Sequence, residues 1–358
     1  MLYLSNLSPW YMNKDTSGPQ MYGNDDACQQ AVPLRSSPDI GDSQPSLHHA
    51  LPMLYDEFAI ARAYPGEYSS QIPAGVPIAR NQTAAELALE AVEVFVQSDD
   101  RRSQYGGYLI YAHDTPEPSF YLTPSLMMKK RLGLKRIQPI AVSDCGSTAF
   151  SCAVELLACL GTDATSATAD SIIVVSDQLA PPMPRLWHNL YPFGDAAIAC
   201  IGSPSHGTWE VVDQVIEEWP CLTKQPYTWS EEENSKHHQL LIEHSCATLE
   251  RYRRTSFMQS DKIRYGIIQQ ISASFEQAVS LTISDIPIYS RRYASACNLL
   301  GSDCLYTLHE LEQERAIQPE EEVLLVMAGP LTRVSLMLLR RTDATTTTAS
   351  LRSNRRCP

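Results

Sequence analysis

The sequence lacks an uninterrupted apolar segment long enough to cross a bilayer. Hydrophobic residues make up 44% of its 358 residues, which is ample for a core. No apolar run, however, reaches the roughly 18 residues that a membrane helix needs. Met1–Ser5 places no basic segment ahead of an apolar one, as a secretory signal does. These absences predict a chain without a membrane span or an export signal, and we expect a cytoplasmic protein.

Positive charge is also scarce. The 28 lysines and arginines stand against 41 aspartates and glutamates, and the formal net charge is −13. A charge of this sign disfavours nucleic acids and anionic membranes as partners. It does not exclude an acidic partner protein, because a local basic patch is enough to dock one.

Metal-binding and redox spacings are missing as well. The 10 cysteines include no Cys-x-x-Cys pair and no zinc spacing. Several stand in apolar segments, as buried free thiols do, which indicates a reducing compartment. His48 and His49 are adjacent, so they do not share a helix face, and no cluster of acidic or cysteine ligands lies nearby in the sequence. No metal, flavin or nucleotide motif is visible, and we expect no bound metal or cofactor.

One stretch instead organises the chain around a cysteine. The apolar run Ile140–Val142 predicts a short buried strand, and small residues turn the chain directly after Cys145. From Ala149 the apolar residues recur at helical spacing, and Gly161 is a plausible stop. A strand–turn–helix of this kind projects the side chain at the bend. Amides at a helix N-terminus favour a thiolate and hold a developing oxyanion.

This pattern alone leaves two interpretations of Cys145 open. It fits a catalytic nucleophile, and it also fits a buried cysteine that acts as a small hydrophobe. Cys152 and Cys159 follow on the same predicted helix, and we expect both to be buried hydrophobes of the second kind.

Periodicity and turn residues predict the rest of the elements. One predicted helix opens at Asn81 or Thr83, and a long polar one has Ser230 as its cap with three glutamates in its first turn. Helices are predicted over residues 51–63, 83–96, 125–132, 149–160, 229–254, 272–281 and 299–315. Strands are predicted over 1–7, 108–113, 140–142, 170–178, 197–202, 208–216, 263–270, 322–328 and 331–339. Residues 8–46 lack periodicity and predict a loop or arm.

Two further segments, taken with Cys145, carry a resemblance. Phe193–Ala199 reads F-G-D-A-A-I-A, and Leu324–Pro330 reads L-L-V-M-A-G-P. In this order they resemble the ketoacyl-ACP synthase III branch of the thiolase superfamily, over about residues 83–341. The resemblance implies a duplicated α/β thiolase fold. Its five layers, α/β/α/β/α, have mixed sheets around a central helix pair that includes the Cys145 helix.

The implied organisation has four parts. Residues 1–80 form an atypical N-terminal strand, loop and helical cap, and 81–216 form the half that carries the nucleophile. Residues 217–341 form the second half, and 342–358 a disordered tail. Asp195, within the F-G-D-A-A segment, is expected to be structural.

The resemblance also implies site residues. The family nucleophile falls on Cys145, and the family asparagine, counted back from Leu308–Leu311, falls on Asn298. Asp303 is a second polar candidate from that segment. The family histidine is not retained: Gln270 falls at its position, with Gln269 beside it. A glutamine amide donates a hydrogen bond but transfers no proton near neutrality, so the chemistry differs at this point.

Three hypotheses about function follow. The first is an acyltransferase or condensing enzyme that accepts an acyl group on Cys145 from acyl-CoA or an acyl carrier protein and passes it on, in a specialised fatty-acid or polyketide-type pathway. The second is a weak or inactive subunit that pairs with an active synthase. The third is an unrelated α/β protein with a structural cysteine.

The resemblance implies a homodimer or a heterodimer with a homologue. Lys129–Arg131 are either a solvated helix end or a docking point for the donor.

Overall fold

The structure is a computed structural model. It describes residues 2–10, 75–79, 82–98, 105–115, 123–160, 169–179, 185–186, 190–219, 230–255, 258, 261–329 and 333–343. The expected helix over 51–63, His48 and His49, most of the expected arm over 8–46 and most of the tail from 342 lie outside these residues. No helix among the described residues is long and apolar enough to cross a membrane.

Nine strands of the described chain join in one mixed sheet, in the order β3-β2-β4-β5-β1-β6-β9-β8-β7. The strands are β1 Tyr3–Pro9, β2 Tyr108–Ala112, β3 Gln138–Val142, β4 Ser171–Asp177, β5 Ala196–Ser203, β6 Trp209–Glu218, β7 Ile263–Ile268, β8 Glu322–Ala328 and β9 Arg333–Arg341. The helices are α3 Ala84–Ser98, α4 Pro124–Arg131, α5 Ala149–Leu160, α6 Glu231–Tyr252, α7 Ala273–Thr282 and α8 Asp303–Gln313. Two 3₁₀ turns, η4 Gly146–Thr148 and η6 Leu300–Ser302, precede α5 and α8.

The sheet has two halves of matching order. The β1 and β6 strands meet through only two residue pairs, Tyr3 with Glu210 and Leu4 with Trp209. On one side of this junction the order is β1-β5-β4-β2-β3, and on the other it is β6-β9-β8-β7. An isolated parallel bridge joins Gly266 of β7 to Ile288. In the second half it takes the place that the parallel pairing of β2 with β3 has in the first half. The predicted duplicated fold with mixed sheets is confirmed.

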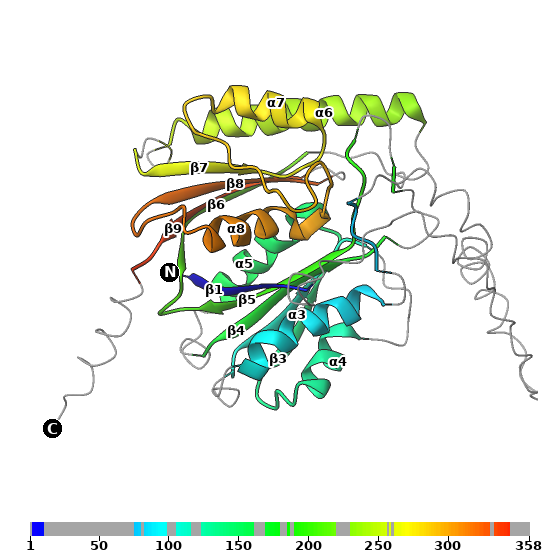
Figure 1. Cartoon of the computed structure of the whole chain (residues 1–358), viewed down its shortest axis with the longest axis vertical. Helices are drawn as coiled ribbons and strands as arrows, with labels where there is room; N and C mark the ends of the chain where they lie inside the picture. The colour runs from blue at the N-terminus through cyan, green and yellow to red at the C-terminus, as the bar shows by residue number, and fades with distance from the viewer. Residues whose placement is uncertain are drawn as a thin grey trace, which may run out of the picture.

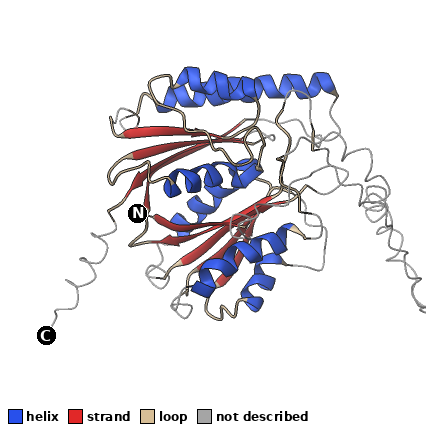
Figure 2. Cartoon of the chain, in the orientation of Figure 1, coloured by secondary structure: helices blue, strands red, loops and turns tan. Residues whose placement is uncertain are grey.

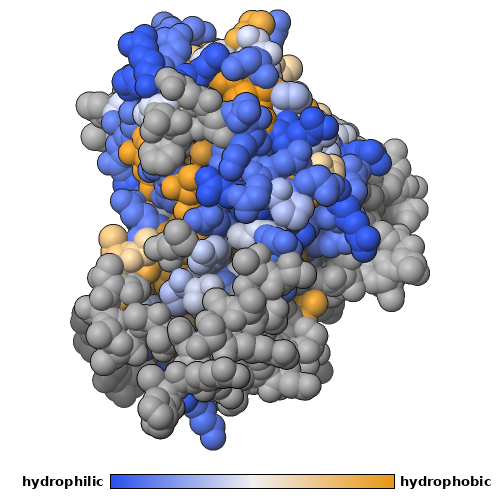
Figure 3. Space-filling view, turned by 90° about the vertical axis from the view of Figure 1, so that its left-hand side faces the viewer, coloured by the Kyte–Doolittle hydropathy of each residue, from blue (hydrophilic) through white to orange (hydrophobic). Residues whose placement is uncertain are grey.

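Helices and sheet halves stack in five layers (Figure 1). The α3 and α4 helices cover the outer face of the first half, and α6 and α7 cover that of the second. The α5 and α8 helices lie between the halves (Figure 2). Separate buried clusters fill the space under α3, the space under α6 and α7, and the central layer. On the face in Figure 3, hydrophilic side chains cover most of the described surface, and apolar ones show in narrow strips.

The helix caps read from the sequence are present. Ser230 Oγ accepts from Glu233 N at 3.2 Å, and the Glu233 carboxylate accepts from Ser230 N at 2.8 Å. Thr83 and Glu86 make the same reciprocal pair at the start of α3. Each pair satisfies amides that a helix N-terminus otherwise leaves unbonded.

Several local predictions were wrong. The strand over 140–142 was expected to be buried, but β3 ends the described sheet order and is half-exposed. Cys159 is exposed and Cys152 only half-buried, because α5 turns one side away from the central layer. The predicted single helix over 299–315 is divided into η6 and α8. Its break is at Asp303, whose carboxylate accepts from Leu299 N at 2.9 Å.

Candidate active site

Cys145 lies in a sharp turn between β3 and the helix pair η4–α5. Its neighbours Asp144 and Gly146 have φ values of 59° and 56°. Aspartate tolerates this left-handed region better than most residues, and glycine adopts it freely. The Cys145 side chain is 9% exposed, and its backbone carbonyl accepts from Thr148 Oγ1 at 2.6 Å. The turn therefore holds one buried thiol at the N-terminal end of a helix, as the sequence predicted.

The segment directly after β8 packs against the bend that carries Cys145. A Cβ added at Gly329 would lie 3.0 Å from Ser147 N and 3.2 Å from Gly146 Cα. Glycine is required at this close approach because any side chain would push the bend away. Gly329, in the Ala-Gly-Pro sequence after β8, is thus the residue that contacts the Cys145 segment.

Asn298 and Gln269 form an amide pair on the other side of this turn. Asn298, 3% exposed, accepts through Oδ1 from Gln269 Nε2 at 3.3 Å and from Leu300 N at 2.9 Å. Gln269 is fully buried and accepts through Oε1 from Ala328 N at 2.9 Å. Ala328 precedes Gly329, so hydrogen bonds and packing connect the pair to the Cys145 bend. Within the described residues, Asn298 Nδ2 donates to no protein group.

Gln270, which the resemblance places at the position of the family histidine, makes different hydrogen bonds from Gln269. Its side-chain oxygen accepts from Cys297 N at 3.4 Å, and its backbone N donates to Asp303 Oδ1 at 3.0 Å. Successive side chains of an extended segment point to opposite faces, so a one-residue difference exchanges the two glutamines. The structure therefore places Gln269, not Gln270, next to Asn298.

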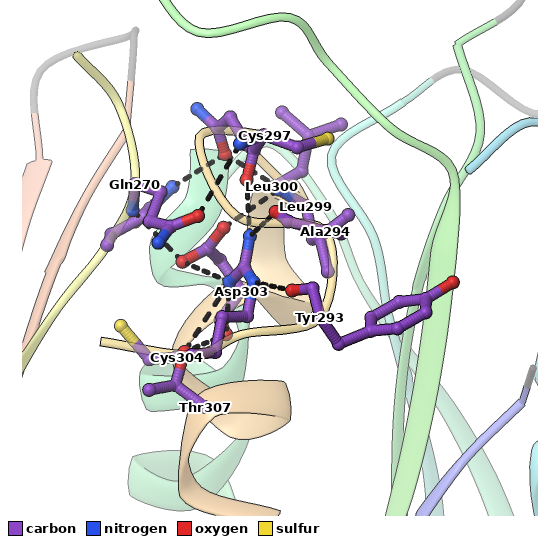
Figure 4. Close-up of polar contacts among 12 residues, drawn as sticks. Gln270, Tyr293, Ala294, Cys297, Leu299, Leu300, Asp303, Cys304 and Thr307 are labelled. Carbon is purple, nitrogen blue, oxygen red and sulfur yellow. Dashed lines mark hydrogen bonds and ion pairs between the residues drawn. The ribbon is translucent and has the colours of Figure 1, made fainter. Parts of the chain in front are cut away.

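A buried ion pair shapes the loop that carries Asn298. Arg291 and Asp303 are both fully buried, with Nη1 and Oδ1 2.9 Å apart. Arg291 also donates to the backbone carbonyls of Tyr293 at 3.0 Å and Ala294 at 3.3 Å, and to that of Cys297. Gln270 and Tyr293 lie on opposite sides of this network (Figure 4). Asp303, a second polar candidate in the sequence, is thus neutralised and bonded on several sides, which suits a structural role.

The F-G-D-A-A segment, which belongs to the first half, hydrogen-bonds to the backbone of Asn298. Gly194 N donates to Asn298 O, and Asn298 N donates to Pro192 O, both at 2.9 Å. Asp195 accepts from Ala79 N at 2.8 Å and Leu179 N at 3.0 Å, and it pairs with Arg185. These bonds use the Asp195 carboxylate to join loops, in agreement with the structural role expected for it.

Sequence reasoning missed two features next to Cys145. Asp114, just past β2, interacts with the Gly146 amide, and its pKa is raised to about 7 by burial and by the charge of Asp177. Its position at the carboxyl end of a strand adjacent to β3 was the available signal, because side chains at the ends of parallel strands converge.

The second feature is a thiol with an arginine. Arg333 Nη1 donates to Cys152 Sγ at 3.7 Å, and the Cys145 thiol donates to the backbone carbonyl of Ser143 at 3.3 Å. The neighbouring Cys145 thiol, followed by the Arg333 charge, lowers the pKa of Cys152 to about 7 against the effect of burial. The neighbouring Cys152 and burial together raise the pKa of Cys145. The sequence showed no sign of this contact because Arg333 is 181 positions from Cys152.

Comparisons with known proteins agree with this fold. No protein-family model matches the sequence, and no curated protein matches it. The solved structure of ChlB3, described as an acyltransferase, superposes with a TM-score of 0.67 at 14% identity and covers 96% of this chain and 98% of that chain. The 3-oxoacyl-(acyl carrier protein) synthase III, FabH, of Pseudomonas aeruginosa PAO1 gives 0.61 at 13% identity, with coverage of 96% and 98%. Xanthomonas campestris OleA gives 0.57 at 12%, with coverage of 81% and 91%. The chain shares its fold, the thiolase fold, with these three proteins.

Proposed function

We propose that the chain is an acyltransferase or condensing enzyme of the ketoacyl-ACP synthase III type. The acyl donor is a thioester of CoA or of a phosphopantetheinyl carrier protein, and Cys145 receives the acyl group. The observation that supports this most is the buried Cys145 thiol in a strained turn at a helix N-terminus. A thiolate there attacks the thioester carbonyl carbon, the CoA or carrier thiol leaves, and the acyl group stays on sulfur until a second substrate takes it.

The amide pair supplies hydrogen-bond donors for the carbonyl oxygen of a substrate. Asn298 Oδ1 is already an acceptor for two N–H groups, which orients its Nδ2 as a donor. Gln269 Nε2 has a second N–H besides the one that it gives to Asn298. Fixed donors of this kind stabilise an oxyanion or an enolate as charge develops. Neither amide moves a proton, so the pair suits a binding role, and the base for Cys145 lies elsewhere.

One observation favours a second candidate, a subunit with little activity of its own. The resemblance puts Gln270 at the position of the family histidine, and the neighbouring Gln269 donates to Asn298; neither amide transfers a proton near neutrality. In that case Cys145 would accept no acyl group, and the chain would serve a homologous synthase as its dimer partner.

Intact-protein mass spectrometry separates the two candidates. The wild-type chain and Cys145→Ala are incubated with a panel of acyl-CoAs and acyl carrier proteins. The enzyme proposal predicts a gain of one acyl mass in the wild type, absent in the variant. No gain with any donor from a well-folded chain would favour the supporting subunit, and co-purification with a homologous synthase would then be the next measurement.

A further inference from the structure

A polar cavity in the second half has no part in the chemistry proposed above. Gln270 and Glu276 line it, and neither Cys145 nor Asn298 is among the described residues that do so. We propose that this cavity binds a small molecule that carries both an ammonium group and a carbonyl oxygen, and that its binding is coupled to the loop that carries Asn298. The inference goes beyond acyl transfer and does not depend on it.

Three segments bring polar groups to the cavity. Gln270 follows β7, Glu276 and Ser280 lie on α7, and Arg291 lies between α7 and α8. The exposed Ser290 also lines the cavity, so a ligand can enter from solvent. The volume is about 180 Å³. A water molecule takes about 30 Å³ in the liquid, so the cavity has room for about six waters or for a ligand of similar bulk.

The Gln270 amide presents an oriented donor to the cavity. Its side chain is only 6% exposed, and Oε1 accepts from Cys297 N at 3.4 Å. Because Cys297 N is a donor, this bond fixes the amide with its oxygen toward the loop. Among the described residues, Nε2 donates to no protein group. A buried donor without a partner is unfavourable, so Nε2 favours a ligand that offers an acceptor such as a carbonyl oxygen.

Glu276 adds a negative charge that no cation of the described chain offsets directly. One of its carboxylate oxygens accepts from Tyr191 OH at 3.2 Å, and the other accepts from no group of the described residues. Arg291, the cation of the same lining, is ion-paired with Asp303 instead. Burial raises the pKa of Glu276 above its ordinary value, as expected of a carboxylate without a counterion.

These groups together favour an ammonium ligand. An ammonium group donates hydrogen bonds and accepts none, so it matches the free oxygen of Glu276. Ser280 lies four residues further along α7, on the same side of the helix, and its hydroxyl can accept another N–H. The carbonyl oxygen of the ligand then receives the hydrogen bond from Gln270 Nε2.

The cavity and the Asn298 loop share two residues. Gln270 accepts from Cys297 N, and Arg291 donates to the carbonyls of Cys297 and Ala294. Cys297 directly precedes Asn298, and Figure 4 shows the bond from Cys297 to Gln270 at the edge of the Asp303 network. A ligand that binds Nε2 holds the amide in the orientation that supports the loop, so ligand binding and loop order reinforce each other.

Titration calorimetry with β-alaninamide tests the binding site. At neutral pH this molecule has an ammonium group at one end and an amide carbonyl at the other, and it is small enough for the cavity. We expect the wild-type chain to bind one molecule. Propionamide, which lacks the ammonium group, and propylamine, which lacks the carbonyl, are each expected to bind about tenfold more weakly or worse, because each leaves one of the two protein groups unpaired.

Matched variants locate the ligand. Glu276→Gln keeps the shape of the side chain and removes its charge, and it is expected to weaken β-alaninamide binding about tenfold or more. Ser280→Leu fills the cavity from α7 and is expected to abolish binding. Glu250→Gln, exposed on the neighbouring helix α6, is the control and is expected to leave the affinity unchanged. Circular dichroism checks that all the variants are folded.

Hydrogen exchange tests the coupling to the loop. Saturating β-alaninamide is expected to slow exchange of the amides of residues 293–298 about threefold or more in the wild type and not in Ser280→Leu. Binding without this protection would overturn the coupling. Failure of all three probes to bind would show that the cavity holds only water, and an unchanged affinity in Glu276→Gln would place the ligand elsewhere; either result overturns the site. No acyl donor is used, so these outcomes are separate from acyl transfer to Cys145.

Discussion

At the residue scale, Gln269 and Gln270 are adjacent in sequence but serve different parts of the structure. Gln269 bonds to Asn298 and to Ala328 N, and Gln270 bonds to Cys297 N. The sequence could show that the resembled family's histidine is missing at this point, because the two residue types there are both glutamine. It could not decide which of the two glutamines bonds to Asn298, because side-chain directions at a strand end depend on register, and a shift of one residue reverses them.

These two glutamines give a matched pair of variants. Gln269→Ala removes a donor from the amide pair and is expected to lower kcat for acyl transfer about 100-fold, in line with the loss of one oxyanion donor. Gln270→Ala removes a side chain that accepts from Cys297 N in the loop, and kcat is expected to change less than about threefold. Steady-state kinetics with a reactive acyl-CoA would measure both. An equal loss in the two variants would contradict the assignment of Gln269.

At the element scale, the loop between Arg291 and α8 is held by one buried ion pair. Arg291 donates to backbone carbonyls along the loop, and Asp303 accepts from Gln270 N and Leu299 N. Helical periodicity over 299–315 was visible in the sequence, so the helix itself could be predicted. Its division at Asp303 could not, because a buried partner 12 positions earlier in sequence, Arg291, fixes that break.

Removing the arginine should therefore be costly. Arg291→Met leaves the Asp303 carboxylate buried without its partner, and the free energy of unfolding is expected to fall by about 3–5 kcal/mol. Arg251→Ala breaks the exposed pair with Glu217 and is expected to cost less than about 1 kcal/mol. Urea titration followed by circular dichroism measures both. Equal, small losses would show that the buried pair does not stabilise the loop.

At the scale of the whole molecule, the order of elements and three short segments, the third being Leu324–Pro330, were enough to predict the fold. F-G-D-A-A marks the loop that joins the first half to Asn298, and the Cys145 turn marks the start of the central helix. Contacts between the halves could not be predicted. The pair of Arg333 with Cys152 and the approach of Gly329 to Gly146 join segments that are far apart in sequence, and only the packed fold brings them together.

The half-exposed β3 edge leads us to propose a homodimer, with two β3 strands paired around a two-fold axis. An edge strand offers unpaired backbone groups to another copy. Ala141→Arg puts a charge on the exposed face of β3 and is expected to convert dimer into monomer in sedimentation velocity. Gln277→Arg, exposed on α7 of the second half, is the control and is expected to leave the dimer unchanged. Wild-type chain that sediments as a monomer at all concentrations would contradict the proposal.

The central claim is that Cys145 is the residue that holds the acyl group, and one measurement addresses it directly. The wild-type chain is mixed with acyl-CoA, quenched in acid within the first turnover and digested, and the thioester is located by tandem mass spectrometry. We predict an acyl group on Cys145 that forms before any product of the second substrate and disappears when that substrate is added. An acyl group on another cysteine, or product released without any acylated Cys145, would contradict the account.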